Sequence, residues 1–319
     1  MNQPKSASTD EPTDLLPMKC SRRPRRVQLA VPGSNEKMIA KAAASRADHV
    51  FLDLEDAVAP KEKVASRARI VQALRTLDWG GKTRCVRIND LDTPWCYEDV
   101  IAVVEGAREQ LDTILLPKAN RPSDVQFLAT LLTQIERKLE LPKRIGIEVL
   151  IEEVEGLQNV AAIAHASNRL ECLIFGMGDY SASHGVDPRA LREEGFYPGD
   201  LWYFARFAVV MAARAAGLDA VDGPYANFVS ERGYADECRK ALALGCVGKW
   251  AIHPSQIPIA LEIFTPDPSE VARAREMVAG YAAAAAQGLG SVNVGGMMVD
   301  AATIRILRNV LARAELYGM

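Results

Sequence analysis

The sequence predicts an α/β fold, a (β/α)8 TIM barrel followed by a helical lid segment at the carboxyl end. Short β-branched runs alternate along the chain with longer helical patterns rich in alanine and charge, the order expected of a parallel sheet with crossover helices. Eight such runs occur, and 319 residues are enough for a barrel. A doubly wound open sheet shows the same alternation and is the second interpretation.

Each expected strand is a short apolar run that ends in polar residues. In order, the strands are Val27–Val31, Val50–Leu54, Thr83–Ile88, Thr113–Leu116, Arg144–Ile151, Glu171–Phe175, Leu218–Val221 and Val247–Ile252. The clearest helical patterns between and after them are Ser34–Ser45, Lys61–Leu77, Ser123–Leu139, Leu201–Ala216 and Ser255–Ile263. Seven linking helices and one after the last strand complete the count of a barrel.

The two ends of the chain differ in character from the middle. Residues 1–20 are polar and proline-punctuated, and we expect a disordered arm there. Residues 21–265 hold the predicted barrel. Residues 266–319 read as a helix (Glu270–Ala286), a glycine-rich loop and a last helix (Ala301–Tyr317). Because so small a segment cannot form a core of its own, we expect it to pack on a neighbouring subunit.

Composition excludes several classes of protein. Hydrophobic residues make up 49% and charged residues 25%, as in a soluble globular protein. The net charge of −3 gives no attraction to nucleic acid or membrane, and no apolar run approaches the roughly 18 residues of a membrane span. The six cysteines form no CxxC pair, so we expect a reduced, cytoplasmic protein without a zinc site.

Two acidic residues follow successive expected strands. Glu152 ends the run IGIEVLI, and Asp179 follows CLIF by a short glycine-containing loop. Because the carboxyl ends of parallel strands meet at one rim, these carboxylates are expected to converge. Oxygen ligands suit a hard divalent cation, so we predict an Mg²⁺ site, with Mn²⁺ possible, on Glu152 and Asp179.

Other polar residues gather at the same rim. Arg87 follows the third strand and is predicted to clamp a substrate carboxylate through both prongs of its guanidinium. Glu55 and Asp56 follow the second strand and are expected to bind substrate by holding metal-bound water. Lys118, taken alone, reads as a surface or salt-bridge lysine. A cation held here suits chelation of a 2-oxo acid and stabilisation of an oxyanion as a carbon–carbon bond forms or breaks.

Several motifs then carry a family resemblance. The stretches PGSNEKMIAKAAASRADHVFLDLEDAVAPKEK, VRIN, LPK, LIEEVEG, FGMGDYSAS and GKWAIHPSQI occur in this order. They resemble the HpcH/HpaI aldolase–citrate lyase family from about Arg25 to the C-terminus. Within that family, the sequence looks most like the L-malyl-CoA/β-methylmalyl-CoA lyases.

The resemblance implies a barrel that assembles into trimers or hexamers and binds CoA thioesters together with a 2-oxo acid. It implies metal ligands at Glu152 and Asp179, and substrate contact at Arg87. The CoA contacts implied by position are Arg25, Pro32, Lys37, Lys249, Ile252, His253 and Pro254. A family aspartate in a C-terminal GxMxD segment reaches a neighbouring active site, and Asp300 inherits that catalytic acid/base role by position. We expect closure of the apolar lid to raise the pKa of Asp300.

The implied reaction is reversible cleavage of L-malyl-CoA to acetyl-CoA and glyoxylate, and of β-methylmalyl-CoA to propionyl-CoA and glyoxylate. Three enzymes of the same family remain open as alternatives: a citramalyl-CoA lyase, a malyl-CoA thioesterase and a citrate lyase β subunit. A CoA-ester binding protein without activity is the alternative outside enzymes. One methyl group in a pocket is worth only about 1–3 kcal/mol, so the sequence does not separate glyoxylate from pyruvate.

Overall fold

The structure, a computed structural model, describes residues 23–192 and 199–319. The expected N-terminal arm, residues 1–20, lies outside the described residues. In the part of the chain that is described, no helix has both the length and the apolar character needed to cross a membrane.

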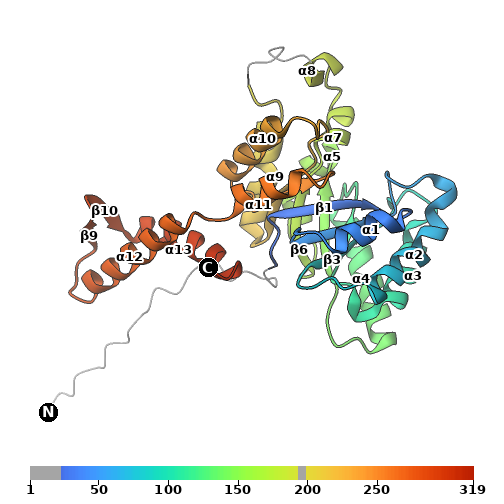
Figure 1. Cartoon of the computed structure of the whole chain (residues 1–319), viewed down its shortest axis with the longest axis horizontal. Helices are drawn as coiled ribbons and strands as arrows, with labels where there is room; N and C mark the ends of the chain where they lie inside the picture. Colours follow the sequence, from blue (N-terminus) through green and yellow to red (C-terminus); the bar gives the residue numbers. More distant parts are fainter. Residues whose placement is uncertain (1–22, 193–198) are drawn as a thin grey trace.

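Eight parallel strands close into a barrel in the order of the sequence (Figure 1). They are β1 (Val27–Pro32), β2 (His49–Asp53), β3 (Thr83–Arg87), β4 (Thr113–Leu116), β5 (Gly146–Ile151), β6 (Leu170–Phe175), β7 (Asp219–Asp222) and β8 (Gly248–Ala251). They fall on the eight predicted runs, with ends shifted by one or two residues. Because β1 pairs with both β2 and β8, the sheet has no edge strand, and the open-sheet interpretation is wrong.

Helices connect the strands and cover the outside of the barrel. They are α1 (Glu36–Ala43), α2 (Lys63–Thr76), α3 (Cys96–Ala107), α4 (Pro122–Leu139), α5 (Val154–Gln158), α6 (Val160–Ala164), α7 (Met177–His184), α8 (Pro188–Arg192), α9 (Tyr203–Ala216), α10 (Glu231–Leu244) and α11 (Gln256–Phe264). Short 3₁₀ turns occur at η1 (Pro60–Glu62) and η2 (Arg108–Gln110). With helices on the outside and side chains filling the inside, the strands are buried on both faces, which explains their continuous apolar runs.

The barrel interior is filled by a compact layer of apolar side chains. Its members come from seven strands and are Phe51, Cys85, Leu115, Leu150, Cys172, Ile174, Val221 and Trp250. Cys85 and Cys172 are fully buried in this layer, which confirms that they act as small apolar residues. A plugged centre leaves the two ends of the barrel as separate polar regions.

Residues after α11 form a separate arm that stands off one side of the barrel (Figure 1). It consists of α12 (Pro268–Ala285), β9 (Ser291–Val294), β10 (Met297–Asp300) and α13 (Ala301–Leu316). The glycine-rich segment was expected to be a loop, but β9 and β10 pair as an antiparallel hairpin. Gly295 and Gly296 turn the chain at φ values of 58° and 83°, and two successive positive φ angles are what a two-residue hairpin turn requires.

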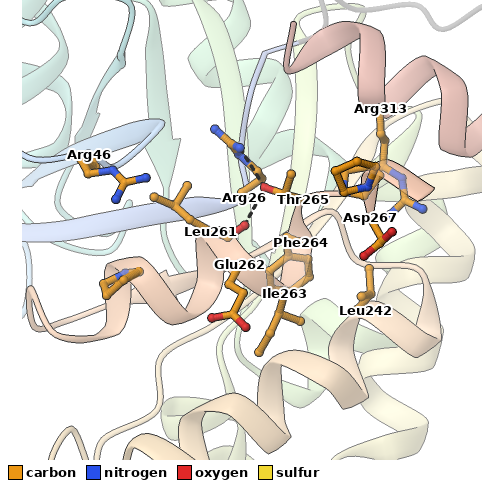
Figure 2. A pocket seen from close by; sticks show the side chains of 13 residues that line it. Arg26, Arg46, Leu242, Leu261, Glu262, Ile263, Phe264, Thr265, Asp267 and Arg313 are labelled. Atoms are coloured by element: carbon orange, nitrogen blue, oxygen red, sulfur yellow. Dashed lines mark hydrogen bonds between the residues drawn. The ribbon is translucent and has the colours of Figure 1, made fainter. Parts of the chain in front are cut away.

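The arm makes few contacts with its own barrel. Its own small core consists of Met277, Val299 and Ile304. A groove of about 1180 Å³ lies between the root of the arm and the amino end of the barrel; Figure 2 shows it with Arg46 from the barrel and Arg313 from α13 among the lining residues. Beside this groove the Arg26 guanidinium lies over the ring of Tyr317, 4.4 Å from its centroid.

Candidate active site

The carboxyl ends of β2 to β6 bring their polar side chains to one rim, as the sequence predicts. Arg87 ends β3 and lies on the apolar layer, 5.9 Å from the ring centroid of Phe51 and 5.8 Å from that of Trp250. Its Nε and Nη2 donate to the two carboxylate oxygens of Asp53 at 2.7 and 2.6 Å. Asp53 thus holds the Nε–Nη2 edge of Arg87 in the structure, and the two-pronged clamp on a substrate carboxylate stays a prediction.

The third nitrogen of Arg87 faces the rim. Nη1 lies 2.9 Å from Glu55 Oε2 and 3.8 Å from Asp56 Oδ2. Asp56 is exposed, whereas Glu55 is buried. Of the Arg87 nitrogens, Nη1 is thus the one that an incoming anion could reach by displacing Glu55.

Glu55 is a buried carboxyl whose charge is only partly compensated. The Lys63 ammonium fixes the loop that carries it by donating to the carbonyls of Leu54 and Glu55 at 2.9 and 2.8 Å. Burial raises the pKa of Glu55 to about 6, against the opposing influence of Arg87 and Lys118. Its Oε2 contacts Arg87 as an ion pair but accepts no hydrogen bond in the structure.

Glu152, directly after β5, is the most strongly perturbed carboxyl at the rim. It is 3% exposed, and burial, then the nearby Glu55 charge, raise its pKa well above the ordinary value. Its Oε1 accepts the backbone N–H of Lys118 at 3.0 Å. On the other side, a Cβ at Gly176 would lie 2.8 Å from Oε2, so glycine is needed there.

Asp179 lies in the first turn of α7 and is exposed at the rim. Its charge also contributes to the raised pKa of Glu152, so the two carboxylates face a common region. Among the described residues, no group of three or more His, Cys, Asp or Glu side chains is placed to hold a metal ion. A cation here would rest on two carboxylates and water, which fits the habit of Mg²⁺. The buried, undercompensated Glu152 is the observation that favours this fit.

Similarity to known proteins identifies the family of the chain. The sequence profile described as HpcH/HpaI aldolase/citrate lyase matches residues 26–254. A Cereibacter sphaeroides protein named L-malyl-CoA/beta-methylmalyl-CoA lyase is 42% identical over 304 residues, which are 92% of this chain and 96% of that protein. The chain belongs to the HpcH/HpaI aldolase/citrate lyase family. The family predicted from the sequence motifs is thus confirmed.

Solved structures of other proteins agree with this family assignment. A citrate lyase of Burkholderia xenovorans LB400 has a TM-score of 0.81 over 92% of each chain; at 23% identity it supports the barrel fold alone. CitE of Mycobacterium tuberculosis, in complex with magnesium, acetoacetate and coenzyme A, is 31% identical with a TM-score of 0.70. The match covers 91% of this chain and 97% of the CitE chain.

Of the seven CoA contacts that the HpcH/HpaI resemblance implied, two are wrong. Arg25 is 1% exposed and lies at the amino end of the barrel, where it pairs with carboxylates. Lys249 is fully buried between the barrel and its helices and binds Asp222 and the carbonyl of Gly223. Neither side chain reaches the rim, because each is already enclosed by the charges that neutralise it.

The remaining implied CoA contacts do lie beside the carboxyl ends of β1 and β8. Pro32 and Ile252 are half-buried, whereas Lys37, His253 and Pro254 are exposed. His253 stacks on Phe228, with ring centroids 4.9 Å apart. These five residues stay predictions.

Asp300 lies in the arm of this family member rather than at the rim of its own barrel. It is the N-cap of α13 and accepts the backbone N–H of Thr303 at 2.8 Å. This cap lowers the pKa of Asp300 below its ordinary value. This lowered pKa belongs to the isolated chain, so the rise expected on closure of the lid over a neighbouring site stays a prediction.

Sequence reasoning missed the residues that organise the rim of this HpcH/HpaI protein. Asp53 takes the Arg87 fork, Lys63 fixes the Glu55 loop, and Lys118 touches both Glu55 and Glu152. Asp53 and Lys118 each lie at or just after a strand end, so the strand pattern offered a signal for both. Lys63 lies on a helix and offered none.

Proposed function

We propose that the protein is a CoA-ester lyase that uses Mg²⁺, with Mn²⁺ as a substitute. It cleaves L-malyl-CoA to acetyl-CoA and glyoxylate, and β-methylmalyl-CoA to propionyl-CoA and glyoxylate. The observation that carries the proposal is the buried Glu152, whose pKa stays well above its ordinary value because Arg87 and Lys118 do not outweigh burial and the nearby charges of Glu55 and Asp179. The name of the Cereibacter sphaeroides relative supports the choice of substrates.

The rim residues supply the parts of this reaction. When bound, the divalent ion would act as a Lewis acid at the hydroxyl or carbonyl oxygen of the 2-carbon unit. Glu152 and Asp179 would hold it, and Arg87 Nη1 would bind the substrate carboxylate in place of Glu55. In the cleavage direction the hydroxyl gives its proton to a base, the oxygen forms the carbonyl of glyoxylate, and the electron pair of the broken carbon–carbon bond goes to the thioester as an enolate. The α-carbon of the released thioester then takes up a proton from an acid.

We assign that proton transfer to Asp300 of a neighbouring subunit. The arm that carries Asp300 has only a small core of its own, around Met277, Val299 and Ile304, and stands away from its own barrel (Figure 1). A segment of this size needs further burial to be stable, and docking on a neighbour would also remove Asp300 from water. We therefore propose a homo-oligomer, a trimer or hexamer, in which residues 266–319 act as a lid on the adjacent site.

Exposed apolar side chains support assembly. On α9, Tyr203, Phe204 and Phe207 project from the outer face, and Phe204 is 82% exposed. On the arm, Met298 and Ile306 are 69% and 66% exposed. Such surfaces favour association between chains.

Assays in the condensation direction test the proposal. Acetyl-CoA and propionyl-CoA should each condense with glyoxylate, lose turnover in EDTA and regain it with Mg²⁺. Preference for pyruvate would indicate a citramalyl-CoA lyase. Release of free CoA from malyl-CoA would indicate a thioesterase, and dependence on an acyl-carrier protein a citrate lyase β subunit. Absence of turnover with all of them would refute the lyase.

Subunit mixing tests the shared site. Asp300→Ala and Glu152→Gln chains should each be inactive alone, and co-assembled chains should regain activity because some sites then combine an intact rim with an intact arm. Equal inactivity of the mixture, after exchange of subunits is verified by mass spectrometry, would contradict the assignment of Asp300 to a neighbouring site.

A further inference from the structure

Lys118 has an unusual backbone conformation for its place in the fold. Its φ is 46°, and the other non-glycine residues with positive φ in the described chain are Arg108 and Glu140. Those two are the C-caps of α3 and α4, where the chain leaves a helix; Glu140 has the left-handed conformation common at such caps. Lys118 instead follows strand β4. A residue with a Cβ is disfavoured in this conformation, so the surrounding contacts must hold it there.

The left-handed turn aims the backbone of Lys118 at the proposed metal ligand. Its N–H donates to Glu152 Oε1 at 3.0 Å. Gly176 bounds the opposite side, because a Cβ there would lie 2.6 Å from the Glu152 Cβ. The Glu152 carboxylate is thus fixed between one donor and one close backbone, although its own charge is disfavoured by burial.

The side chain of the same residue reaches the carboxylate pair beside Arg87. The Lys118 ammonium forms an ion pair with Glu55 Oε1 and lies 3.7 Å from Asp56 Oδ2. Glu55 in turn contacts Arg87 Nη1. One residue therefore touches both halves of the rim, the carboxylate proposed to hold a cation and the guanidinium proposed to bind the substrate carboxylate.

We propose that Lys118 is a positioning residue: its left-handed backbone orients Glu152 toward the cation, and its ammonium competes with Arg87 Nη1 for Glu55, so that the carboxylate of the 2-oxo acid can displace Glu55 from Nη1. This inference rests on the proposed lyase site and deepens it. A lysine that served only as a surface ion pair would place no demand on its backbone conformation and would not affect substrate affinity.

A matched pair of variants separates the effect of the Lys118 backbone conformation from the effect of losing its ammonium. Lys118→Asn and Lys118→Val both remove the ammonium, but asparagine tolerates a left-handed backbone and valine does not. We expect the dissociation constant for Mn²⁺, measured by electron paramagnetic resonance without substrate, to rise about 10- to 100-fold in Lys118→Val relative to Lys118→Asn. Equal constants in two folded variants would overturn the backbone half of the proposal.

A third variant tests the ammonium. Lys118→Met keeps the length of the side chain and the N–H while removing the charge. We expect the KM for glyoxylate to rise about tenfold or more with kcat changed far less, because ground-state binding of the carboxylate is weakened. Lys138→Met, which removes an exposed lysine paired with Glu105, is the control and should leave both constants unchanged. An unchanged KM in Lys118→Met would overturn the ammonium half, whether or not Lys118→Val folds.

Glu152→Gln separates this inference from the lyase proposal. If Glu152→Gln binds Mn²⁺ as tightly as the natural chain, the metal site itself is wrong. If it loses Mn²⁺ while the Asn and Val variants bind equally, the metal site stands and the backbone role of Lys118 is wrong.

Discussion

Glu148 and Glu152 lie on and just after the same strand, both are buried, and their pKa values move in opposite directions. Burial raises the pKa of both. At Glu148 the opposing influences of His49, Arg25 and Gln28 outweigh burial, and the pKa falls below its ordinary value. At Glu152 the neighbouring Glu55 adds to burial, and the pKa rises. The apolar layer of the barrel, including Leu150, separates the two carboxyls.

The amino end of the barrel holds an ion network centred on Arg25. Arg25 lies 3.2 Å from Glu148, 2.7 Å from Glu171 and 3.0 Å from Asp219. Gln28 adds a hydrogen bond of 2.9 Å to Glu148. The Glu148 charge is compensated within the chain, as expected for the stability face of a barrel, whereas burial keeps the pKa of Asp219 raised.

The carboxyl end is an incomplete network. Glu152 and Glu55 keep raised pKa values although Arg87 and Lys118 are close to them. The difference teaches that burial alone does not distinguish structural from functional carboxylates in this fold. What distinguishes Glu148 from Glu152 is whether the chain itself supplies enough compensating charge.

The largest expected effect is a loss of activity at the carboxyl end of the barrel. In Glu152→Gln we expect kcat/KM to fall by on the order of 10⁴, because the cation loses a ligand and its stabilisation of the oxyanion. Chemical denaturation in EDTA should meanwhile show no loss of stability, since a disfavoured charge has been removed. The exposed Glu155→Gln is the control for activity. A folded Glu152→Gln enzyme with ordinary kcat/KM would remove Glu152 from the site.

The next largest effect is a loss of folding stability at the amino end of the barrel. Arg25→Met leaves Glu148, Glu171 and Asp219 buried without their shared cation, and we expect the free energy of unfolding to fall by about 3–5 kcal/mol. At a temperature where the variant is folded, its KM for CoA thioesters should match that of the natural chain. A raised KM with unchanged stability would restore Arg25 as a CoA contact and contradict its place in the network.

A smaller effect sharpens the role of Arg87. Lysine keeps the charge but loses the fork that holds Asp53 and the Nη1 that faces the rim. We expect Arg87→Lys to lower kcat/KM by about 30- to 100-fold, which corresponds to about 2–3 kcal/mol for hydrogen bonds to charged groups. Isothermal titration should show weaker binding of a 2-oxo acid analogue. Lys82→Arg, away from the rim, serves as the matched exchange, and equal losses in both variants would argue against a specific role.

The smallest effect is a pH dependence of opposite sign at the two ends. The pKa of Glu55 is about 6 in the folded chain, above its unfolded value, so its contribution to stability is present below about pH 4.3 and is lost as pH rises through 6. Glu148, whose pKa is lowered, contributes stability at higher pH that is lost on acidification. Relative to Glu55→Gln, the metal-free chain should lose on the order of 2 kcal/mol between pH 4 and 7. If the urea midpoints of the natural chain and of Glu55→Gln changed in parallel across this pH range, the raised pKa of Glu55 would be contradicted.

Much of this protein followed from the sequence by itself. The alternation of apolar runs and helical patterns gave the barrel, because strands buried on both faces need continuous apolar side chains. The same pattern placed Arg87, Glu152 and Asp179 at strand ends, and parallel strands bring their ends to one rim. Polar and apolar residues also alternate in Ser291–Val294, which indicates a strand, although this segment was expected to be part of a loop.

Only the tertiary structure decided which charges compensate one another. Arg25 and Lys249 look from the sequence like available cations, yet Arg25 is enclosed by carboxylates from distant strands and Lys249 is buried against Asp222 of the adjacent strand β7. The left-handed turn at Lys118 and the fork between Arg87 and Asp53 likewise depend on contacts across the barrel. Sequence periodicity predicts which face of an element a side chain occupies. Whether its charge is neutralised depends on its distance from opposite charges in the folded chain. The barrel therefore follows from local pattern, and the division between its stable end and its reactive end follows from long-range electrostatics.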